Sequence, residues 1–458
     1  MNHQKKPLLV TVALALCSLS LSFAADVRIA LFQADVTPPI GSPLCHGNVS
    51  NVLTVVDPLT ARGVVLLPAK QKPIVLCAVD WVANSNAGYD EWRTALAKAV
   101  GTTVERVAVH TVHQHDAPGC DFSTEELLAT QGLTNQFSNV AFAREAIARA
   151  AQAARQAMKR SEPVTHIGIG QGKVDKFASA RRVLGPDGKV KYSRTSACRK
   201  PGAREDPEGV IDPLVRVLSF WDGDQPRVVL SYYATHPMSY YGKGGVSADT
   251  VGIARAMREA ALSGVPHIYF TGAGGNVTAG KYNDGSPENR PVLAQRLARG
   301  MEEAWKATRK SSLRAADIEW RVKAVALPLR EELADEAPNL KIFTDTSAKT
   351  RDRVFAARNL AWSRRCKAGH QVDLSCLRLG SVYVLHMPGE LFVEYQLAAQ
   401  QMRPDAAVCM AAYGDDGCGY IGTEIAYSQG GYETGRPSRV APQVEHVLMG
   451  AMKALLEH

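Results

Sequence analysis

The alternation of short apolar runs with amphipathic helical patterns constrains the fold of this 458-residue chain more than any other feature. After Pro213, strand-like runs at 215–221, 228–233 and 268–270 are interleaved with helical patterns at 250–262 and 290–308. Strands that alternate with helices are typical of α/β domains with a parallel or mixed sheet. We therefore expect an α/β fold in which helices flank a mixed β-sheet.

The rest of the chain continues this pattern. Further strands are predicted at 27–32, 63–67, 74–79, 107–109, 165–172, 318–327, 381–386 and 406–412. Further helices are predicted at 89–100, 139–160, from Glu390 and at 444–456, with a charged helical stretch ending near 365. No Pro/Gly/Ser-rich linker and no repeat divides the sequence. We expect one large catalytic domain spanning residues 26–458.

The first 25 residues have the pattern of a secretory signal peptide. Lys5 and Lys6 precede an apolar run at 8–16, and the small residues Ala24 and Ala25 offer a cleavage site. The apolar run is too short to be a good membrane span. The sequence thus predicts an exported protein, periplasmic or secreted, from which the signal peptide 1–25 is removed.

The charge pattern bears on the partners of the protein. Removing the signal peptide lowers the formal net charge from +8 to +6, because Lys5 and Lys6 are its charged residues. The remaining charge is spread out, without a Lys/Arg-rich run or an interleaved aromatic platform. This distribution argues against a nucleic-acid partner and is compatible with contact with an anionic membrane surface.

Eight of the nine cysteines lie outside the signal peptide, and an even number in an exported protein allows disulfides. Cys366 and Cys376 stand in a charged segment that reads as a loop, and they are the preferred pair. Cys409 and Cys418 come next. Cys77 lies within an apolar strand run and is expected to be a buried thiol. No CxxC spacing occurs, which argues against a zinc site built from thiolates.

The strand-like run at 107–109 ends in a histidine-rich stretch, His110-Thr-Val-His113-Gln-His115, which a Pro-Gly turn signal closes. If the chain stays extended, His113 and His115 share one face. Imidazole is the commonest protein metal ligand, so three within six residues favour a metal or acid/base site over three structural histidines. Further ligands must come from elsewhere in the chain.

Three other segments carry polar residues at turns after strands. His236 follows the run at 228–233 and precedes a proline, which makes it the first candidate for a second ligand. Gly275 to Lys281 nearly matches a phosphate-binding P-loop but lacks the Ser or Thr that holds magnesium. Its glycines are better suited to let backbone N–H groups approach a substrate or an oxyanion. Glu390 follows a Pro-Gly turn at the start of a predicted helix, where the helix dipole alone also favours an acid.

Taken in order, these segments resemble the neutral/alkaline non-lysosomal ceramidase family of zinc-dependent amidases. The resemblance begins at the Ala34-Asp-Val-Thr-Pro-Pro-Ile-Gly41 loop and at 57–62, continues through the histidine motifs, and ends at a tyrosine-rich stretch near Tyr432. Each motif alone is weak, but six in the family's order form a specific signal. The resemblance implies a neutral-ceramidase-like α/β catalytic domain, and we expect the family's C-terminal β-sandwich to be absent.

The resemblance also implies roles for individual residues. The family's HTHSGPG segment reads HQHDAPG here, where His113 resembles a zinc ligand and His115 a catalytic histidine outside the ligand set. One catalytic zinc ion is implied, with ligands from His113, His236, Glu390 and Tyr420. The implied catalytic groups are His115, Arg181, Thr278 and Tyr432. His110 has no counterpart in the family pattern and is expected to be structural.

Two residues depart from the family pattern, and one further assignment stays open. The family's AGDVSP segment appears here as Gly274-Gly-Asn276-Val-Thr278-Ala279, with Asn276 for an aspartate and Thr278 for a serine. Thr278 keeps a hydroxyl but adds a methyl, so we expect a narrower or differently angled pocket, with Gly275 and Asn276 as substrate-binding residues. Arg182 is adjacent to Arg181, which leaves open which of the two arginines orients the substrate.

The implied reaction is the hydrolysis of a lipid amide, with N-acylsphingosine cleaved to a fatty acid and a sphingoid base by zinc-activated water. Arg181 and Tyr432 would then stabilise the oxyanion, and His115 would pass a proton to the leaving amine. Three alternatives stay open. They are a zinc hydrolase of other amides, esters or lactones, a lipid-binding relative without activity, and a hydrolase with a Thr or Ser nucleophile.

Overall fold

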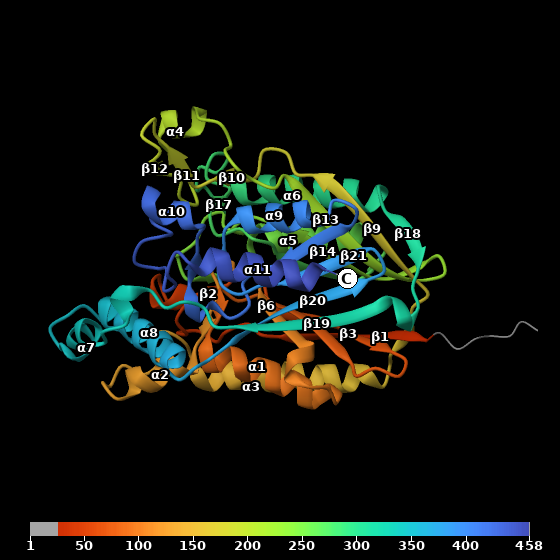
Figure 1. Ribbon diagram of the computed structural model, residues 1–458, viewed down its shortest axis with the longest axis horizontal. Coiled ribbons are helices and arrows are strands. Elements are labelled where there is room, and N and C mark those ends of the chain that lie inside the picture. Colours follow the sequence, from red (N-terminus) through yellow and green to blue (C-terminus); the bar gives the residue numbers. More distant parts are fainter. Residues whose placement is uncertain (1–25, 458) are drawn as a thin grey trace, which may run out of the picture.

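Three main β-sheets organise the chain, where the sequence pattern predicts one mixed sheet. The structure is a computed structural model that describes residues 26–457, so the predicted signal peptide at 1–25 lies outside the described residues. Each main sheet combines antiparallel pairs with one parallel pair, and helices flank all three sheets (Figure 1). The predicted α/β class, with mixed strands and flanking helices, is therefore confirmed.

The first sheet has the strand order β6-β4-β3-β1-β8. Its strands are β1 (Val27–Asp35), β3 (Thr60–Pro68), β4 (Ile74–Val79), β6 (Val107–Thr111) and β8 (Glu162–Pro163). Helices α1 (Asn86–Val100) and α3 (Val140–Met158) cover its outer face, on the lower side of Figure 1. The buried stripe of α3 is rich in alanine, and such small side chains let the helix lie close to the sheet.

The second sheet has the order β16-β14-β13-β9-β18. Its strands are β9 (His166–Lys173), β13 (Leu214–Asp222), β14 (Gln225–Tyr233), β16 (His267–Thr271) and β18 (Arg309–Ser312). Helices α5 (Asp249–Ala261) and α6 (Asn289–Lys306) pack on it. Gly170 of β9 permits the contact with α6, because a Cβ atom there would collide with the carbonyl oxygen of Ala304.

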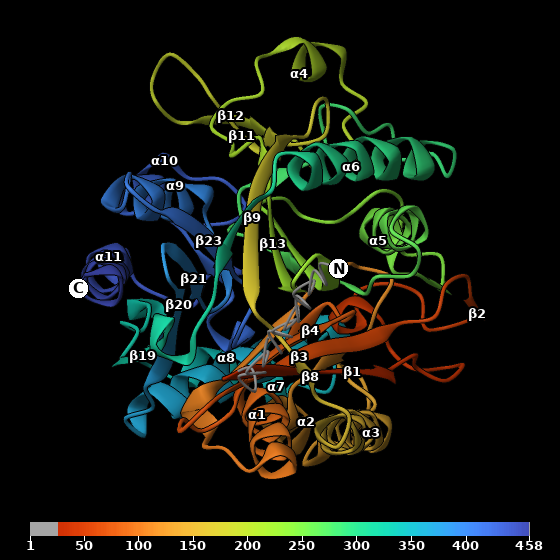
Figure 2. The ribbon, with the colours of Figure 1, turned by 90° about the vertical axis from the view of Figure 1, so that its right-hand side faces the viewer.

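The third sheet has the order β19-β20-β21-β23. Its strands are β19 (Ile318–Val325), β20 (Val372–Leu379), β21 (Val382–His386) and β23 (Ala407–Ala411). Helices α9 (Val393–Met402) and α11 (Val444–Leu456) flank it, on the left of Figure 2. Helices α7 (Ala337–Thr344) and α8 (Thr350–Lys367) pack against each other beside it.

Shorter elements fill the loops. They are α2 (Phe122–Ala129), α4 (Pro201–Glu205), α10 (Glu424–Gln429), the hairpin β11 (Arg182–Leu184) and β12 (Val190–Ser193), and the pair β2 (Thr54–Val55) and β15 (Gly245–Val246). Among the described helices, none is both long and apolar enough to cross a bilayer.

The three sheets share one apolar core, to which buried residues of α5 and α6 also belong, and the helices surround the sheets (Figure 2). Strands β6, β16 and β23 each form an edge of their own sheet, and these edges meet. Backbone N–H groups of Thr111 and Ala412 donate to the carbonyls of Tyr413 and Thr271, each at 2.9 Å, and the Thr271 hydroxyl donates to Val112 O at 2.7 Å. Because the parallel pairs end together here, the loops that follow them converge on one place.

The predicted disulfides are wrong. All eight cysteines from Cys45 to Cys418 are free thiols. Cys366 lies at the end of α8 and Cys376 in the middle of β20, so the segment is helix and strand where a loop was expected. Cys409 belongs to the core shared by the three sheets, whereas Cys418 packs in the cluster between the third sheet and its helices. Burial raises the pKa of Cys376 and of Cys409 to about 12.

Candidate active site

His113 lies in the loop that follows β6. The strand ends at Thr111, and His113 adopts a left-handed conformation with φ of +72°, so the extended geometry considered for His113 and His115 is not formed. The Nδ1–H group of His113 donates to Val82 O at 2.6 Å. This bond fixes the ring and leaves Nε2 free to act as a ligand.

His236 follows β14 of the second sheet and is fully buried. Its Nδ1–H group donates to Gly274 O at 2.6 Å, so the glycine-rich turn after β16 sets the orientation of this ring. The ring centroids of His113 and His236 lie 4.9 Å apart. Both histidines therefore offer Nε2 while a backbone carbonyl holds Nδ1, which is the arrangement usual for histidines that bind metal.

Glu390 completes the cluster from the third sheet. It lies in the two-residue strand β22 (Glu390–Leu391), which pairs with β24 (Tyr420–Ile421), and α9 begins only at Val393. The predicted helix start at Glu390 is therefore wrong, and a helix dipole does not explain this acid. Its Oε2 lies 3.0 Å from Nε2 of His236 and 3.2 Å from Nε2 of His113. Burial opposes ionisation of this carboxyl, but the two imidazoles hold its pKa well below the usual range.

The cluster fits a metal ion. One ligand atom each from His113, His236 and Glu390 lie within 4.8 Å of one another, and all three residues are buried. Nε2 of His113 is buried and lies 3.2 Å from the Glu390 carboxylate, but it makes no well-formed hydrogen bond among residues 26–457. An unsatisfied buried nitrogen is costly unless a ligand engages it. Two imidazoles and a carboxylate are also a donor set that catalytic zinc uses.

Tyr420 and Arg181 border this cluster. The Tyr420 hydroxyl lies 3.3 Å from Nε2 of His236 and accepts a hydrogen bond from Nη1 of Arg181 at 2.9 Å. Arg181 follows the two-residue strand β10 (Ser179–Ala180), which pairs with β17 (Val277–Thr278). Burial disfavours its charge, but Tyr420 and Glu433 raise the pKa of Arg181. Nε of Arg181 lies 3.1 Å from Glu433 Oε1, which holds the guanidinium in place.

The adjacent Arg182 takes another direction. Its Nη2 donates to the carbonyl of Ala426 at 3.0 Å, and its Nη1 lies 3.4 Å from Glu433. Of the two arginines, Arg181 is the one bonded to Tyr420, so the structure brings Arg181 and not Arg182 to the ligand cluster.

A cavity of about 400 Å³ opens onto the cluster. Its wall includes His113, Glu390 and Tyr420 together with two further predicted residues, His115 and Tyr432. The Nδ1–H group of His115 faces His113 O at 3.2 Å, and burial together with His113 and His236 holds its pKa well below the usual range. Tyr432 is 56% exposed, and its ring meets the Tyr420 ring edge-on at 5.7 Å.

The glycine-rich turn lies behind the cluster, and its predicted residues do not line this cavity. Gly275 donates to Leu391 O at 2.8 Å, and a Cβ atom there would collide with the carbonyl oxygen of Glu390. Asn276 accepts from Val393 N at 2.9 Å and donates to Glu394 at 2.8 Å. The turn thus supports β22 and α9. The next long helix, α6, starts only at Asn289, which excludes a P-loop.

Thr278 ends β17 and is fully buried. Its hydroxyl has no hydrogen-bond partner within the described chain. The pairing of β17 with β10 places it opposite Ser179, two residues before Arg181, and its role in catalysis stays a prediction.

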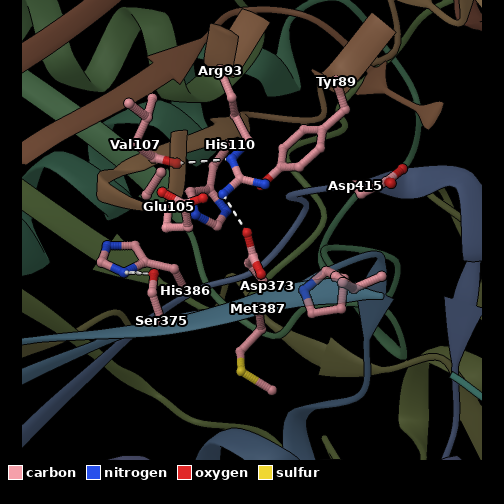
Figure 3. A pocket seen from close by; sticks show the side chains of 13 residues that line it. Tyr89, Arg93, Glu105, Val107, His110, Asp373, Ser375, His386, Met387 and Asp415 are labelled. Atoms are coloured by element: carbon pink, nitrogen blue, oxygen red, sulfur yellow. Dashed lines mark hydrogen bonds and ion pairs between the residues drawn. The ribbon is translucent and has the colours of Figure 1, made fainter. Parts of the chain in front are cut away.

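His110 lies apart from the ligand cluster. Its Nδ1–H group donates to Ala412 O at 2.7 Å, and its ring is near that of His386 at 5.4 Å between centroids. The two rings line a small cavity of about 10 Å³ with the ion pair of Arg93 and Asp373 (Figure 3). Burial lowers the pKa of His110 to about 4, so the ring is neutral.

Sequence reasoning missed several residues of the site. Tyr413 stacks on His113 with centroids 4.4 Å apart, and Glu433 anchors Arg181. Tyr413 follows a predicted strand, so its position at a strand end was a usable signal, and Glu433 follows the predicted residue Tyr432 in a turn region. Arg358 and Arg439 also line the cavity, but no local pattern marks them.

No family model matches the sequence, and no curated protein does. Solved structures do match the fold. A ceramidase complexed with C2 shares 17% identity and a TM-score of 0.68, with 94% of this chain and 75% of that chain covered. The neutral ceramidase from Pseudomonas aeruginosa matches with the same identity and TM-score, and 74% of that chain is covered. The resemblance noted in the sequence is thus confirmed in the fold, and the chain has the neutral ceramidase fold.

Proposed function

We propose that this protein is an exported, zinc-dependent hydrolase that cleaves an amide bond in a lipid-like substrate. The observation that carries the proposal is the cluster of His113, His236 and Glu390 beside a cavity of about 400 Å³. Structures with the same fold include ceramidases, which supports the amide of an N-acylsphingosine as the substrate class to test first. The signal peptide pattern at 1–25 supports export.

In this proposal His113, His236 and Glu390 hold the zinc ion, with Tyr420 beside it. Bound zinc supplies a Lewis acid for the carbonyl and lowers the pKa of bound water to about 7. Arg181, whose guanidinium Glu433 keeps in position, and Tyr432, whose ring lies 5.4 Å from that guanidinium, are the groups proposed to polarise the amide carbonyl.

His115 is the proposed proton carrier. Its Nδ1–H group is engaged by the carbonyl of His113, so Nε2 is the nitrogen that can accept a proton and pass it to the leaving amine. The ring of Tyr241 lies 4.9 Å away and limits its movement. Proton transfer through a positioned imidazole is typically worth about 100-fold or more in rate.

Metal analysis together with hydrolysis assays tests the proposal. We expect about one zinc ion per purified chain, release of fatty acid from a short-chain ceramide, and loss of this activity after treatment with dipicolinate. Added zinc should restore it. Full activity of a protein stripped of metal would contradict the proposal and favour a Thr or Ser nucleophile. Esters and lactones with matched acyl chains, assayed in parallel, separate an amidase from a broader hydrolase.

A further inference from the structure

The cavity carries a second group of charged side chains besides the ligand cluster. Four arginines line it, and we call them the arginine wall: Arg351, Arg358, Arg436 and Arg439. They come from α8 and from the segment after Tyr432. Apart from Glu390, the lining contains one acid, Asp352, so the wall has a clear excess of positive charge. An uncharged lipid amide does not require such a wall.

Arg439 is the most deeply buried of the four, with 1% of its surface exposed. Its Nε donates to Asn359 at 2.9 Å and its Nη1 to Gly417 O at 3.3 Å, but its Nη2 has no acceptor within residues 26–457. Burial and the nearby charge of Arg358 lower the pKa of Arg439 to about 9. Asp416 and Asp121 offset part of this effect, but the ion pair of Asp416 is with Arg358 and not with Arg439.

Arg358 is also incompletely neutralised. Its ion pair within the described chain is with Asp416 at 3.7 Å, which is too long for a hydrogen bond. Arg436 and Arg351 stand further out. Arg436 donates to Asp352 at 3.1 Å and stacks on Phe355, whereas Arg351 is exposed.

Two buried arginines away from the cavity, Arg255 and Arg194, are paired more completely than Arg439. Arg255 pairs with Asp80 at 2.8 Å. Arg194, which has no carboxylate, donates to four backbone carbonyls. The guanidinium of Arg439 thus has fewer partners than those of Arg255 and Arg194, and Arg439 lines the cavity that the ligand cluster shares.

We propose that the substrate carries a small acidic group, a carboxylate or a phosphate, which Arg358 and Arg439 bind while the ligand cluster holds the amide. This inference rests on the proposed amidase function. Guanidinium groups form paired, charge-assisted hydrogen bonds with both kinds of oxyanion. Arg351 and Arg436 attract the acidic group at the mouth of the cavity, and Arg358 and Arg439 bind it deeper inside.

Three matched amides test this subsite: N-octanoylethanolamine, N-octanoylglycine and the phosphate ester of N-octanoylethanolamine. Calorimetric titration of the full chain should show at least one acidic amide binding about tenfold or more tightly than the neutral one. The two acidic arms identify whether carboxylate or phosphate is preferred. Substitutions Arg358→Gln and Arg439→Gln should reduce this preference to about threefold or less without weakening the neutral amide.

Arg309→Gln is the matched control, because Arg309 is exposed on β18 and does not line the cavity. It should change none of the affinities. If Arg439→Gln does not fold, Arg358→Gln carries the test, and Arg351→Gln at the exposed mouth should show a smaller loss in the same direction. Equal affinity of the neutral and acidic amides, or equal weakening of all three by Arg358→Gln, overturns the subsite.

Hydrolysis is scored separately from binding. Acidic amides that bind with preference but are never cleaved would overturn the proposed function and leave the subsite standing. Cleavage of the amides without any preference in binding would overturn the acidic subsite and leave the proposed function standing. The two proposals therefore fail in different ways.

Discussion

The loop with His113 and the strand end with His110 are three residues apart, yet they form two different histidine sites. Around His113 and His236 stand a carboxylate and an arginine, Glu390 and Arg181. Around His110 and His386 stand the same residue types, Asp373 and Arg93 (Figure 3). The list of side chains does not distinguish the two sites.

The partners of the carboxylates distinguish them. Asp373 is paired with Arg93 at 2.8 Å, so this carboxylate is already neutralised by a cation. Glu390 instead faces the two Nε2 atoms of His113 and His236, while Arg181 is occupied by Glu433 and Tyr420. The cavity at His110 and His386 has a volume of about 10 Å³, whereas the cavity at His113 has a volume of about 400 Å³. A reactive site needs an uncommitted carboxylate and room for substrate, and the residue types alone supply neither.

The largest effect is expected from His113→Asn compared with His110→Asn. An asparagine amide can replace Nδ1–H as a donor to Val82 O or Ala412 O, but it removes Nε2. His113→Asn should lose its zinc and about a thousandfold in kcat/KM, because the metal supplies several kcal/mol of charge stabilisation. His110→Asn should keep zinc and activity to within about fivefold. Metal analysis and steady-state kinetics on both variants measure this difference. Loss of the metal from His110→Asn as well would show that the two histidine sites are not distinct.

The second effect concerns Arg181 and Arg182, two adjacent arginines that both form an ion pair with Glu433. Arg181→Lys should lower kcat about 100-fold, because lysine cannot donate to Tyr420 and Glu433 at once while facing a carbonyl. Arg182→Lys, at the next position, should retain kcat to within a few fold and lose thermal stability instead. Steady-state kinetics and melting curves measure both, and equal losses of kcat would show that the two arginines are not distinct.

The third prediction concerns how His110 makes the stability of the protein depend on pH. Burial lowers the pKa of His110 to about 4, whereas an unfolded histidine titrates near 6.5. The contribution of the His110 ring to the free energy of unfolding is therefore complete above pH 6.5. It is lost as the pH falls toward 4, because only the unfolded state then binds the proton. The stability of wild type relative to His110→Asn should fall by about 3 kcal/mol from pH 7 to pH 4. Urea unfolding at both pH values measures this, and a constant difference would show that the ring is not buried neutral.

The smallest effect on stability is expected at Thr278, behind the open site. Its buried hydroxyl has no partner, so Thr278→Val should change the free energy of unfolding by about 1 kcal/mol or less. If the hydroxyl acts on the substrate, kcat should nevertheless fall about tenfold or more, and Thr278→Ser should preserve it. A fully active Thr278→Val variant would remove Thr278 from the catalytic set.

Local patterns predicted most of the secondary structure. The terminal helix is found at Val444–Leu456 as expected, and the helix expected at 250–262 is found at Asp249–Ala261. Hydrophobic periodicity is a property of neighbouring residues, so a single sequence carries it. The segment around Glu390 was misassigned as helix because its strand exists only through pairing with Tyr420, thirty residues later.

The candidate site was predicted in part. The three residues of the metal cluster stand after apolar strand runs, and that placement is visible in the sequence. The predicted disulfides failed because spacing along the chain says nothing about which face of a sheet a thiol occupies. The arginine wall could not be predicted, because its residues belong to α8 and a distant loop that meet only in the folded chain.

The sequence by itself determined the α/β alternation and the placement of histidines at strand ends, because both depend on residues close together in the chain. The tertiary structure decided that three sheet edges meet at Thr111, Thr271 and Ala412, and so brought His113, His236 and Glu390 within 4.8 Å. It also decided that Arg93 neutralises Asp373, and that Nη2 of Arg439 has no acceptor within the described chain. These outcomes depend on distance, burial and charge pairing among residues far apart in sequence, which exist only once the sheets have packed.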